Sequence, residues 1–114
     1  MREICPQDVW FADFPFMEDE TQSKKRPVIV LAVDNDTFTV LSMKITSRKP
    51  YGEFEIELHD WAEIPLHHKS TADASSVMAL SRNSFIKRIG KLSNDDWENV
   101  TDLYNNYLKS RNIF

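Results

Sequence analysis

The run PVIVLAVDNDTFTVLSMKIT, residues 27–46, decides the fold, because two strand-like stretches flank a turn. Residues 27–33 are continuously apolar, rich in Val and Ile and too short for a helix, which predicts a strand buried on both faces. The Asp-Asn-Asp sequence at residues 34–36 is typical of a turn, and residues 37–46 predict the returning strand. We therefore expect an antiparallel hairpin at the centre of the protein.

Other short segments with β-branched, aromatic or alternating residues surround this hairpin. They predict strands at residues 8–14, 53–58, 71–80 and 85–89. In the second of these (EFEIEL), Phe54, Ile56 and Leu58 should face inward and the intervening glutamates outward. Pro15 is expected to end the first strand, and the polar residues 16–23 to form a loop.

The C-terminal segment predicts the clearest helix. Ser93 can cap its N-terminus, and Asp96 three residues later can complete a capping box. Apolar side chains then recur at spacings of three and four, which predicts one face packed on the protein. They are Trp97, Val100, Tyr104, Tyr107 and Leu108. A helical turn is also expected at residues 60–63. Several hairpin-connected strands and one helix predict a mainly β fold, a small antiparallel barrel with the C-terminal α-helix covering one end.

Length and composition indicate one domain over residues 1–114. Hydrophobic residues make up 41% of the chain and charged residues 28%, which is typical of a globular protein. Cys5 is the only cysteine in the sequence, so an internal disulfide is excluded. Neither a signal peptide nor a stretch long enough to cross a bilayer is recognisable, and we expect a cytoplasmic protein.

The charge is unevenly distributed along the chain. A net charge of -4 and a pI of about 5.3 argue against a duplex-binding protein, which usually carries a basic surface. Two basic clusters nevertheless stand apart from the acidic stretches. They are Lys24, Lys25 and Arg26, and Lys44, Arg48 and Lys49. Such clusters can create a local anion site, although two solvated loops would have the same composition.

Metal and cofactor sites are not indicated. His67 and His68 are adjacent, and His59 lies eight residues earlier, so no His-x-x-x-His or Glu-x-x-His spacing occurs. Gly52 and Gly90 stand alone, which excludes a glycine-rich phosphate loop. We therefore expect chemistry without a metal or cofactor.

Arg26 and the pair Thr46-Ser47 form the strongest candidate site. Ten residues separate Arg26 from Asp36 in the turn, and ten more lead to Thr46, so an antiparallel hairpin should bring them opposite each other. A guanidinium beside two hydroxyls suits a phosphate group, because arginine matches phosphate geometry and hydroxyls donate to further oxygens. The alternative is that Arg26 pairs with an acidic residue, Glu18 or Asp19, on the surface.

Four segments in order resemble the MazF/PemK family, the toxins of type II toxin–antitoxin systems. Residues 7–15 (QDVWFADFP) resemble the family's opening strand, which usually begins with a glycine and an aspartate. Residues 25–32 (KRPVIVLA) resemble its Arg-Pro-Val-x-Val-Leu-Ser strand. Residues 45–47 (ITS) resemble the end of the next strand, and residues 87–93 (KRIGKLS) the closing segment before the helix.

The resemblance implies a barrel like that of Src-homology domains, usually as a homodimer. It further implies a metal-independent endoribonuclease that cleaves single-stranded RNA and so inhibits translation, with Arg26 and Thr46 as catalytic residues and Ser47 beside them. Arg26 would stabilise charge on the phosphoryl oxygens during transfer to the neighbouring 2′-hydroxyl, and Thr46 would orient the phosphate. Lys24, Lys25, Lys44, Arg48 and Lys49 would bind RNA. A cognate antitoxin protein would be the partner.

The sequence does not assign the residues that act as general acid and general base. Some family members carry an Arg and an Asp in this role, and the corresponding positions fall near Asp73 and Ser75. Asp73 could act as base, or it could be a solvated surface carboxylate. His67 or His68 could substitute, because histidine titrates in the useful range.

Two other functions are compatible with the same residues. The first is a catalytically inactive barrel that binds RNA or a protein through the rim that carries Arg26. The second is a barrel that holds an extended peptide on exposed aromatic residues, for which Trp10, Phe14 and Phe16 are the candidates.

Overall fold

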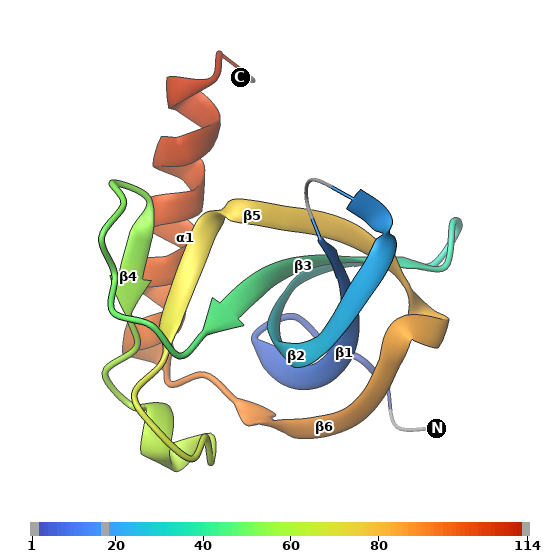
Figure 1. Ribbon diagram of the computed structural model, residues 1–114, viewed down its shortest axis with the longest axis horizontal. Coiled ribbons are helices and arrows are strands. Elements are labelled where there is room, and N and C mark those ends of the chain that lie inside the picture. The colour runs from blue at the N-terminus through green and yellow to red at the C-terminus, as the bar shows by residue number, and fades with distance from the viewer. Residues whose placement is uncertain (1–2, 17–18, 113–114) are drawn as a thin grey trace.

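Residues 27–46 form the expected antiparallel hairpin at the centre of a six-stranded sheet (Figure 1). The computed structural model describes residues 3–16 and 19–112. Strand β2 (Asp19–Asp34) pairs with β3 (Thr39–Thr46), and a turn at residues 35–38 joins them. The register runs from Val28 opposite Lys44 to Asp34 opposite Thr39. The prediction of this hairpin is confirmed.

The remaining strands extend the sheet on both sides of the hairpin. They are β1 (Asp8–Phe16), β4 (Glu55–Glu57), β5 (Thr71–Ser81) and β6 (Phe85–Lys91). The order across the sheet is β4-β5-β3-β2-β1-β6, and every pairing is antiparallel. A short 3-10 turn, η2 (Arg82–Ser84), connects β5 to β6, so the two outer parts of the sheet curl toward each other as a barrel (Figure 1). The predicted mainly β barrel with a C-terminal helix is confirmed.

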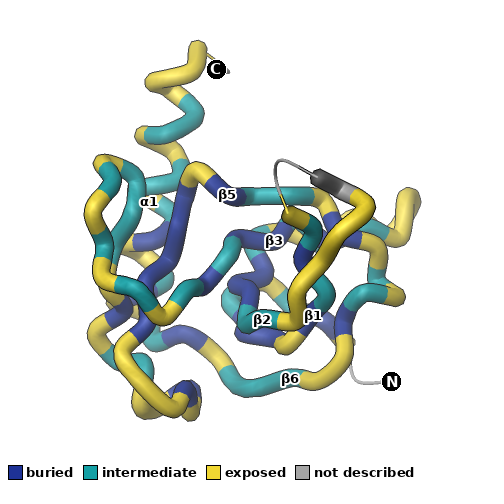
Figure 2. Tube along the Cα trace, viewed as in Figure 1, coloured by how far each residue is buried: buried dark blue, intermediate teal, exposed yellow. Residues whose placement is uncertain are grey.

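Strand β2 separates two hydrophobic clusters. Val28, Ile29 and Val30 are all fully buried, which confirms the prediction that this segment is covered on both faces. Val28 and Val30 face the cluster inside the barrel, whereas Ile29 faces the cluster between the sheet and the helix. Side chains that alternate along a strand point to opposite faces, so a continuous apolar run is required here. Figure 2 shows the buried trace of the inner strands inside a more exposed outer shell.

Helix α1 (Asn94–Ser110) packs on the outer cluster through most of the predicted face, with Leu103 in the contact in place of the predicted Leu108. Ser93 Oγ accepts a hydrogen bond from Asp96 N at 3.2 Å, so the cap is confirmed. The Asp96 carboxylate does not complete the capping box. It is buried, and its two oxygens accept from the backbone N–H groups of His59 and Asp60 at 3.0 and 2.9 Å. It thereby ties the start of α1 to the segment before the 3-10 turn η1 (Trp61–Glu63).

The predicted loop at residues 16–23 is wrong for its described part. Strand β1 continues through Pro15, which lies opposite Ser23, and β2 already begins at Asp19. Pro15 is tolerated because β6 pairs with β1 only as far as Ala12, so the missing N–H faces no second strand. Residues 17–18 lie outside the described part of the chain.

The expected alternation in residues 53–58 is only partly correct. Strand β4 covers only Glu55–Glu57, and the Glu55 side chain is 8% exposed instead of facing solvent. Its carboxylate binds the guanidinium of Arg48, and this partner explains why a glutamate lies inside. Leu58 is buried as expected.

Two of the three aromatic residues considered for peptide binding are not available. Trp10 is 3% and Phe14 is 1% exposed, and both belong to the cluster inside the barrel. The Trp10 Nε1–H donates to the Asp8 carboxylate at 3.2 Å, so the indole is also satisfied internally. Phe16 is 38% exposed, but one side chain does not make a peptide-binding surface. The hypothesis that Trp10 and Phe14 form such a surface is wrong.

Within residues 3–16 and 19–112, no helix has both the length and the apolar composition that crossing a membrane requires.

Replacement of Asp96 tests its role in joining α1 to the barrel. We expect Asp96→Ala to lower the free energy of unfolding by about 2–4 kcal/mol, because two backbone N–H groups lose a charged acceptor. Urea unfolding followed by circular dichroism measures this change. The neighbouring Asp95→Ala is the control, since Asp95 is exposed and its loss should cost less than about 1 kcal/mol. Equal losses in the two variants would contradict the assignment.

Candidate active site

A cavity of about 890 Å³ lies beside β2, β3 and β6 and the segment that leads into β5. Nine side chains that are or can become cationic line it, and no Asp or Glu among the described residues does so. They are Lys24, Lys25, Arg26, Lys44, Arg48, His67, His68, Lys87 and Arg88. This space is called the basic cavity below. Seven of the 14 Lys and Arg of an acidic chain therefore meet in one place.

A close approach of two backbones positions one wall of the basic cavity. A Cβ atom at Gly90 in β6 would lie 1.8 Å from the carbonyl oxygen of Ile64, so only glycine leaves room for this contact. The segment after Ile64 carries His67 and His68, both of which are exposed and line the cavity. The glycine thus allows the histidine-bearing segment to lie directly against β6.

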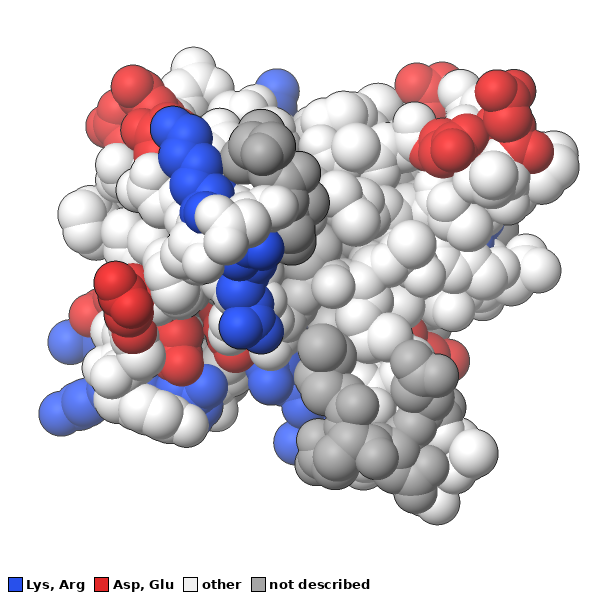
Figure 3. Space-filling model, turned by 90° about the horizontal axis from the view of Figure 1, so that it is seen from above, with Lys and Arg blue, Asp and Glu red and all other residues white. Residues whose placement is uncertain are grey.

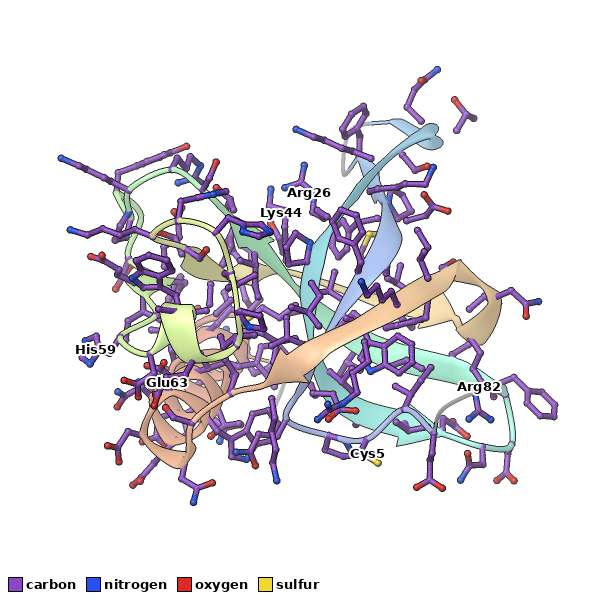
Figure 4. The ribbon with its side chains drawn as sticks, turned by 90° about the horizontal axis from the view of Figure 1, so that it is seen from below. Cys5, Arg26, Lys44, His59, Glu63 and Arg82 are labelled. Atoms are coloured by element: carbon purple, nitrogen blue, oxygen red, sulfur yellow. The ribbon has the colours of Figure 1, made fainter. Side chains whose placement is uncertain are left out.

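Arg26 lies on β2, two residues before the first pair of its ladder with β3. The register pairs Val28 with Lys44, and its continuation by two residues places Arg26 opposite Thr46. Both residues line the basic cavity. Figure 4 shows Arg26 and Lys44, from neighbouring strands, pointing out on the same side of the barrel. The structure thus brings the guanidinium and the hydroxyl to one wall.

The Arg26 side chain has an unsatisfied donor. Its Nε is buried and has no hydrogen-bond partner. Burial also lowers the pKa of the guanidinium from its ordinary value, because the charged form loses contact with water. An anion in the basic cavity would offset the cost of burying the guanidinium, since it can accept hydrogen bonds from a guanidinium and neutralise its charge. The alternative partners, Glu18 and Asp19, have side chains outside the described part.

The Thr46 hydroxyl is oriented by the backbone. Its Oγ1 accepts a hydrogen bond from Arg48 N at 3.0 Å. A hydroxyl that accepts from the protein keeps its own proton available for another acceptor. Ser47 is exposed and also lines the cavity, so a second hydroxyl is available beside the first.

The cations of the cavity differ in how far they are engaged. Arg88 donates to the Asp8 carboxylate at 3.2 Å. Arg48 binds Glu55, lies 3.8 Å from the Asp73 carboxylate, and stacks on Tyr51 with 4.2 Å from its Cζ to the ring centroid. The other five, among the described side chains, form no ion pair. They are Lys24, Lys25, Arg26, Lys44 and Lys87.

Sequence reasoning misplaced one basic residue and missed two. Lys49 is exposed but does not line the cavity. Lys87 and Arg88 do line it, although they were considered only as part of the closing segment. Their adjacent charges in a predicted strand were a usable signal, but the pairing of β6 with β1, which brings them beside β2, is a long-range feature.

Asp73 is a buried structural carboxylate, so the alternative of a solvated surface group is wrong. It is 4% exposed and does not line the basic cavity. It accepts from Ser75 N and Ser75 Oγ at 3.0 and 2.6 Å and from Ser76 Oγ at 2.9 Å. These residues lie where the β3–β5 register jumps from Val77 to Asp73, so the carboxylate holds the bulge together.

The described residues contain no group of three or more His, Cys, Asp or Glu that could hold a metal ion. His59 and Glu63 lie apart from Arg26 and Lys44 in Figure 4, and Cys5 and Arg82 lie on the opposite side. The face shown in Figure 3 carries most of its visible Lys and Arg on one half, where some Asp and Glu lie among them, and a further acidic group at the far corner. The acidic net charge therefore does not prevent a local basic surface.

Comparison with known families and structures gives a consistent result. Residues 6–106 match the family described as PemK-like, MazF-like toxin of type II toxin–antitoxin system. MazF from Deinococcus radiodurans is similar in structure, with a TM-score of 0.78 and 18% sequence identity over 96% of this chain and 99% of that one. An endoribonuclease in complex with its cognate antitoxin from a mycobacterial species gives 0.75 and 12% over 94% and 96%. At these identities the two structures support the fold alone. A search of curated proteins by sequence gives no match.

Replacement of Asp73 tests whether it is structural. We expect Asp73→Ala to lower the free energy of unfolding by about 2–4 kcal/mol, because it leaves the buried Ser76 hydroxyl and the Ser75 donors without their acceptor and removes one of the two carboxylates beside Arg48. Chemical denaturation measures the loss. Glu57→Ala on neighbouring β4 is the control, since Glu57 is exposed and should change stability by less than about 0.5 kcal/mol. Unchanged stability of Asp73→Ala would contradict the structural role.

Proposed function

The chain belongs to the PemK-like, MazF-like toxins of type II toxin–antitoxin systems, and we propose that it is an endoribonuclease that cleaves single-stranded RNA without a metal. Cleavage of mRNA would inhibit translation and growth. One observation carries the proposal: Arg26, whose Nε is buried without a hydrogen-bond partner, lines a cavity together with other cationic and hydroxyl-bearing residues. Such a cavity suits a phosphodiester, which brings negative charge and several acceptor oxygens.

The chemistry we assign to this site is an internal phosphoryl transfer. The 2′-oxygen of the RNA forms a bond to the adjacent phosphorus, and the bond from phosphorus to the 5′-oxygen breaks. The products are a 2′,3′-cyclic phosphate and a 5′-hydroxyl end. Arg26 stabilises the charge that develops on the phosphoryl oxygens, and the Thr46 hydroxyl donates to one of them, with Ser47 beside it. A preorganised donor of this kind lowers the activation barrier by about 3 kcal/mol.

The proton transfers fall to His67 or His68 in this proposal. The 2′-hydroxyl must lose a proton and the leaving 5′-oxygen must gain one. Histidine is the side chain that exchanges protons near neutral pH, and the basic cavity contains two. Asp73 does not reach the cavity and is engaged by its own bulge. Arg26 is a second candidate for protonating the leaving oxygen.

The RNA backbone would follow the exposed lysines around the site. Lys24, Lys25 and Lys49 are exposed, and Lys44 and Arg48 are half-buried. Lys87 adds a further charge from β6. Binding through such charges falls with salt, because RNA releases counterions on binding.

We further propose a cognate antitoxin as partner and a homodimer as the working form. The similar mycobacterial endoribonuclease was solved with its cognate antitoxin. An acidic segment of an antitoxin would satisfy the same cations that bind RNA and would exclude the substrate. The proposed substrate, mRNA, would place the activity in the cytoplasm.

Substitution of the two central residues tests the proposal. Purified protein is incubated with a long RNA in EDTA, and the cut ends are mapped. We expect Arg26→Ala and Thr46→Val each to slow cleavage at least 100-fold and to relieve growth arrest, because each removes a donor to the phosphoryl oxygens. Thr46→Ser should retain most activity.

The control is Arg82→Ala, an arginine in η2 that does not line the cavity, and it should cleave like the wild type. Cleavage that survives both Arg26→Ala and Thr46→Val would show that the site is elsewhere. Wild-type protein that binds RNA but cuts at no sequence would favour the inactive binding module.

Replacement of the histidines tests the acid–base assignment separately. We expect His67→Ala or His68→Ala to lower the cleavage rate by about 10²–10⁴-fold, because the change removes a group that can transfer a proton. The exposed histidine outside the cavity provides the control, and His59→Ala should leave the rate unchanged. Normal rates in both cavity variants would assign the proton transfers to other groups.

A further inference from the structure

Tyr51 is a large exposed side chain that has no role in the candidate site as described above. It is 81% exposed, more than any other large hydrophobic residue in the described part of the chain. It is linked to the basic cavity through Arg48, a lining residue whose guanidinium stacks on its ring, with 4.2 Å from Cζ to the ring centroid.

Both the side chain and the backbone of Arg48 form contacts with the protein, and these contacts fix the guanidinium on which the Tyr51 ring stacks. Its guanidinium binds Glu55 and lies 3.8 Å from Asp73. Its backbone N donates to Thr46 Oγ1 at 3.0 Å, and its carbonyl accepts from Thr71 Oγ1 at 2.6 Å. These contacts connect the support of Tyr51 directly to the hydroxyl in the candidate site.

The ring has one covered face and one free face. The guanidinium covers the first face, and the 81% exposure of the residue leaves the other open to solvent. Stacking surfaces of this kind take up unpaired nucleobases, because every base has a flat face and the contact does not depend on its identity. Since Arg48 both lines the cavity and stacks on the ring, a phosphate in the cavity and a base on the ring can belong to neighbouring parts of one RNA strand.

We propose that Tyr51 is a stacking platform for a nucleobase next to the scissile phosphate of single-stranded RNA. The proposal rests on the proposed ribonuclease function and names how the same site holds its substrate. Arg48 acts here as a positioning residue, since two carboxylates neutralise its charge and its flat guanidinium fixes the ring. The platform therefore contributes affinity that does not depend on salt, whereas the free lysines contribute affinity that does.

The test is a binding measurement in which cleavage cannot occur. A labelled mixed-sequence oligonucleotide with 2′-O-methyl groups lacks the nucleophile and stays intact with the wild-type protein. We expect Tyr51→Ala to weaken its binding roughly 5- to 150-fold with an unchanged salt slope, and Tyr51→Phe to retain it. An abasic oligonucleotide of the same length should bind wild type and Tyr51→Ala equally.

The matched control is Phe38→Ala, which removes an aromatic ring that is 64% exposed but lies in the β2–β3 turn and does not line the cavity. It should bind like the wild type, and thermal unfolding should show all three variants folded. Equal affinity of Tyr51→Ala and wild type would overturn the platform, as would an equal loss with the abasic oligonucleotide. If wild-type protein neither binds the oligonucleotide nor cleaves ordinary RNA, the proposed function fails instead.

Discussion

The antiparallel register of β2 and β3 is the constraint on which the candidate site depends. With Val28 opposite Lys44, the continuation of the two strands sets Arg26 opposite Thr46. A shift by one residue would turn every side chain of β2 to the other face, so Val28, Ile29 and Val30 could not all stay in their clusters. Burial of these three side chains therefore stabilises the register, and the register positions the site.

A second constraint keeps acidic groups out of the basic cavity. Asp8 is engaged by Arg88 and Trp10, and Glu55 by Arg48. Each of these carboxylates has an internal partner, which lowers the cost of burying it. The protein has an acidic net charge but nevertheless presents a cationic site. The local charge depends on which groups at the site have partners and not on the net charge of the protein.

The same pairs that remove acids from the cavity also shape its edge. Asp73 holds the bulge in β5 and helps to fix Arg48. Arg48 in turn orients the Thr46 hydroxyl through its backbone and supports Tyr51 through its side chain. Structural and functional roles are thus joined in one hydrogen-bonded network, so changes at its buried carboxylates are expected to reach the site.

The local pattern of the sequence was sufficient for the hairpin, the strand order along the chain and the cap at Ser93. These features depend on residues close together in sequence, and the near approach of Arg26 and Thr46 follows from counting residues around one turn. Even the family's opening glycine has a local reason, since Gln7 stands in its place here with a φ of 79°, a conformation that glycine adopts without strain.

What only the tertiary structure decided are the contacts between distant segments. It placed Lys87 and Arg88 in the cavity through the pairing of β6 with β1, and it buried Asp73, which could have been a solvated carboxylate, and Asp96, which was expected to complete a capping box. A carboxylate is exposed or buried according to the donors that meet it, and here those donors come from a bulge and from a segment 36 or 37 residues away. Residue spacing along the chain does not predict hydrogen-bond partners of this kind. The amino-acid sequence determined the strands, the hairpin register and the family, and packing decided which charges remain free to act.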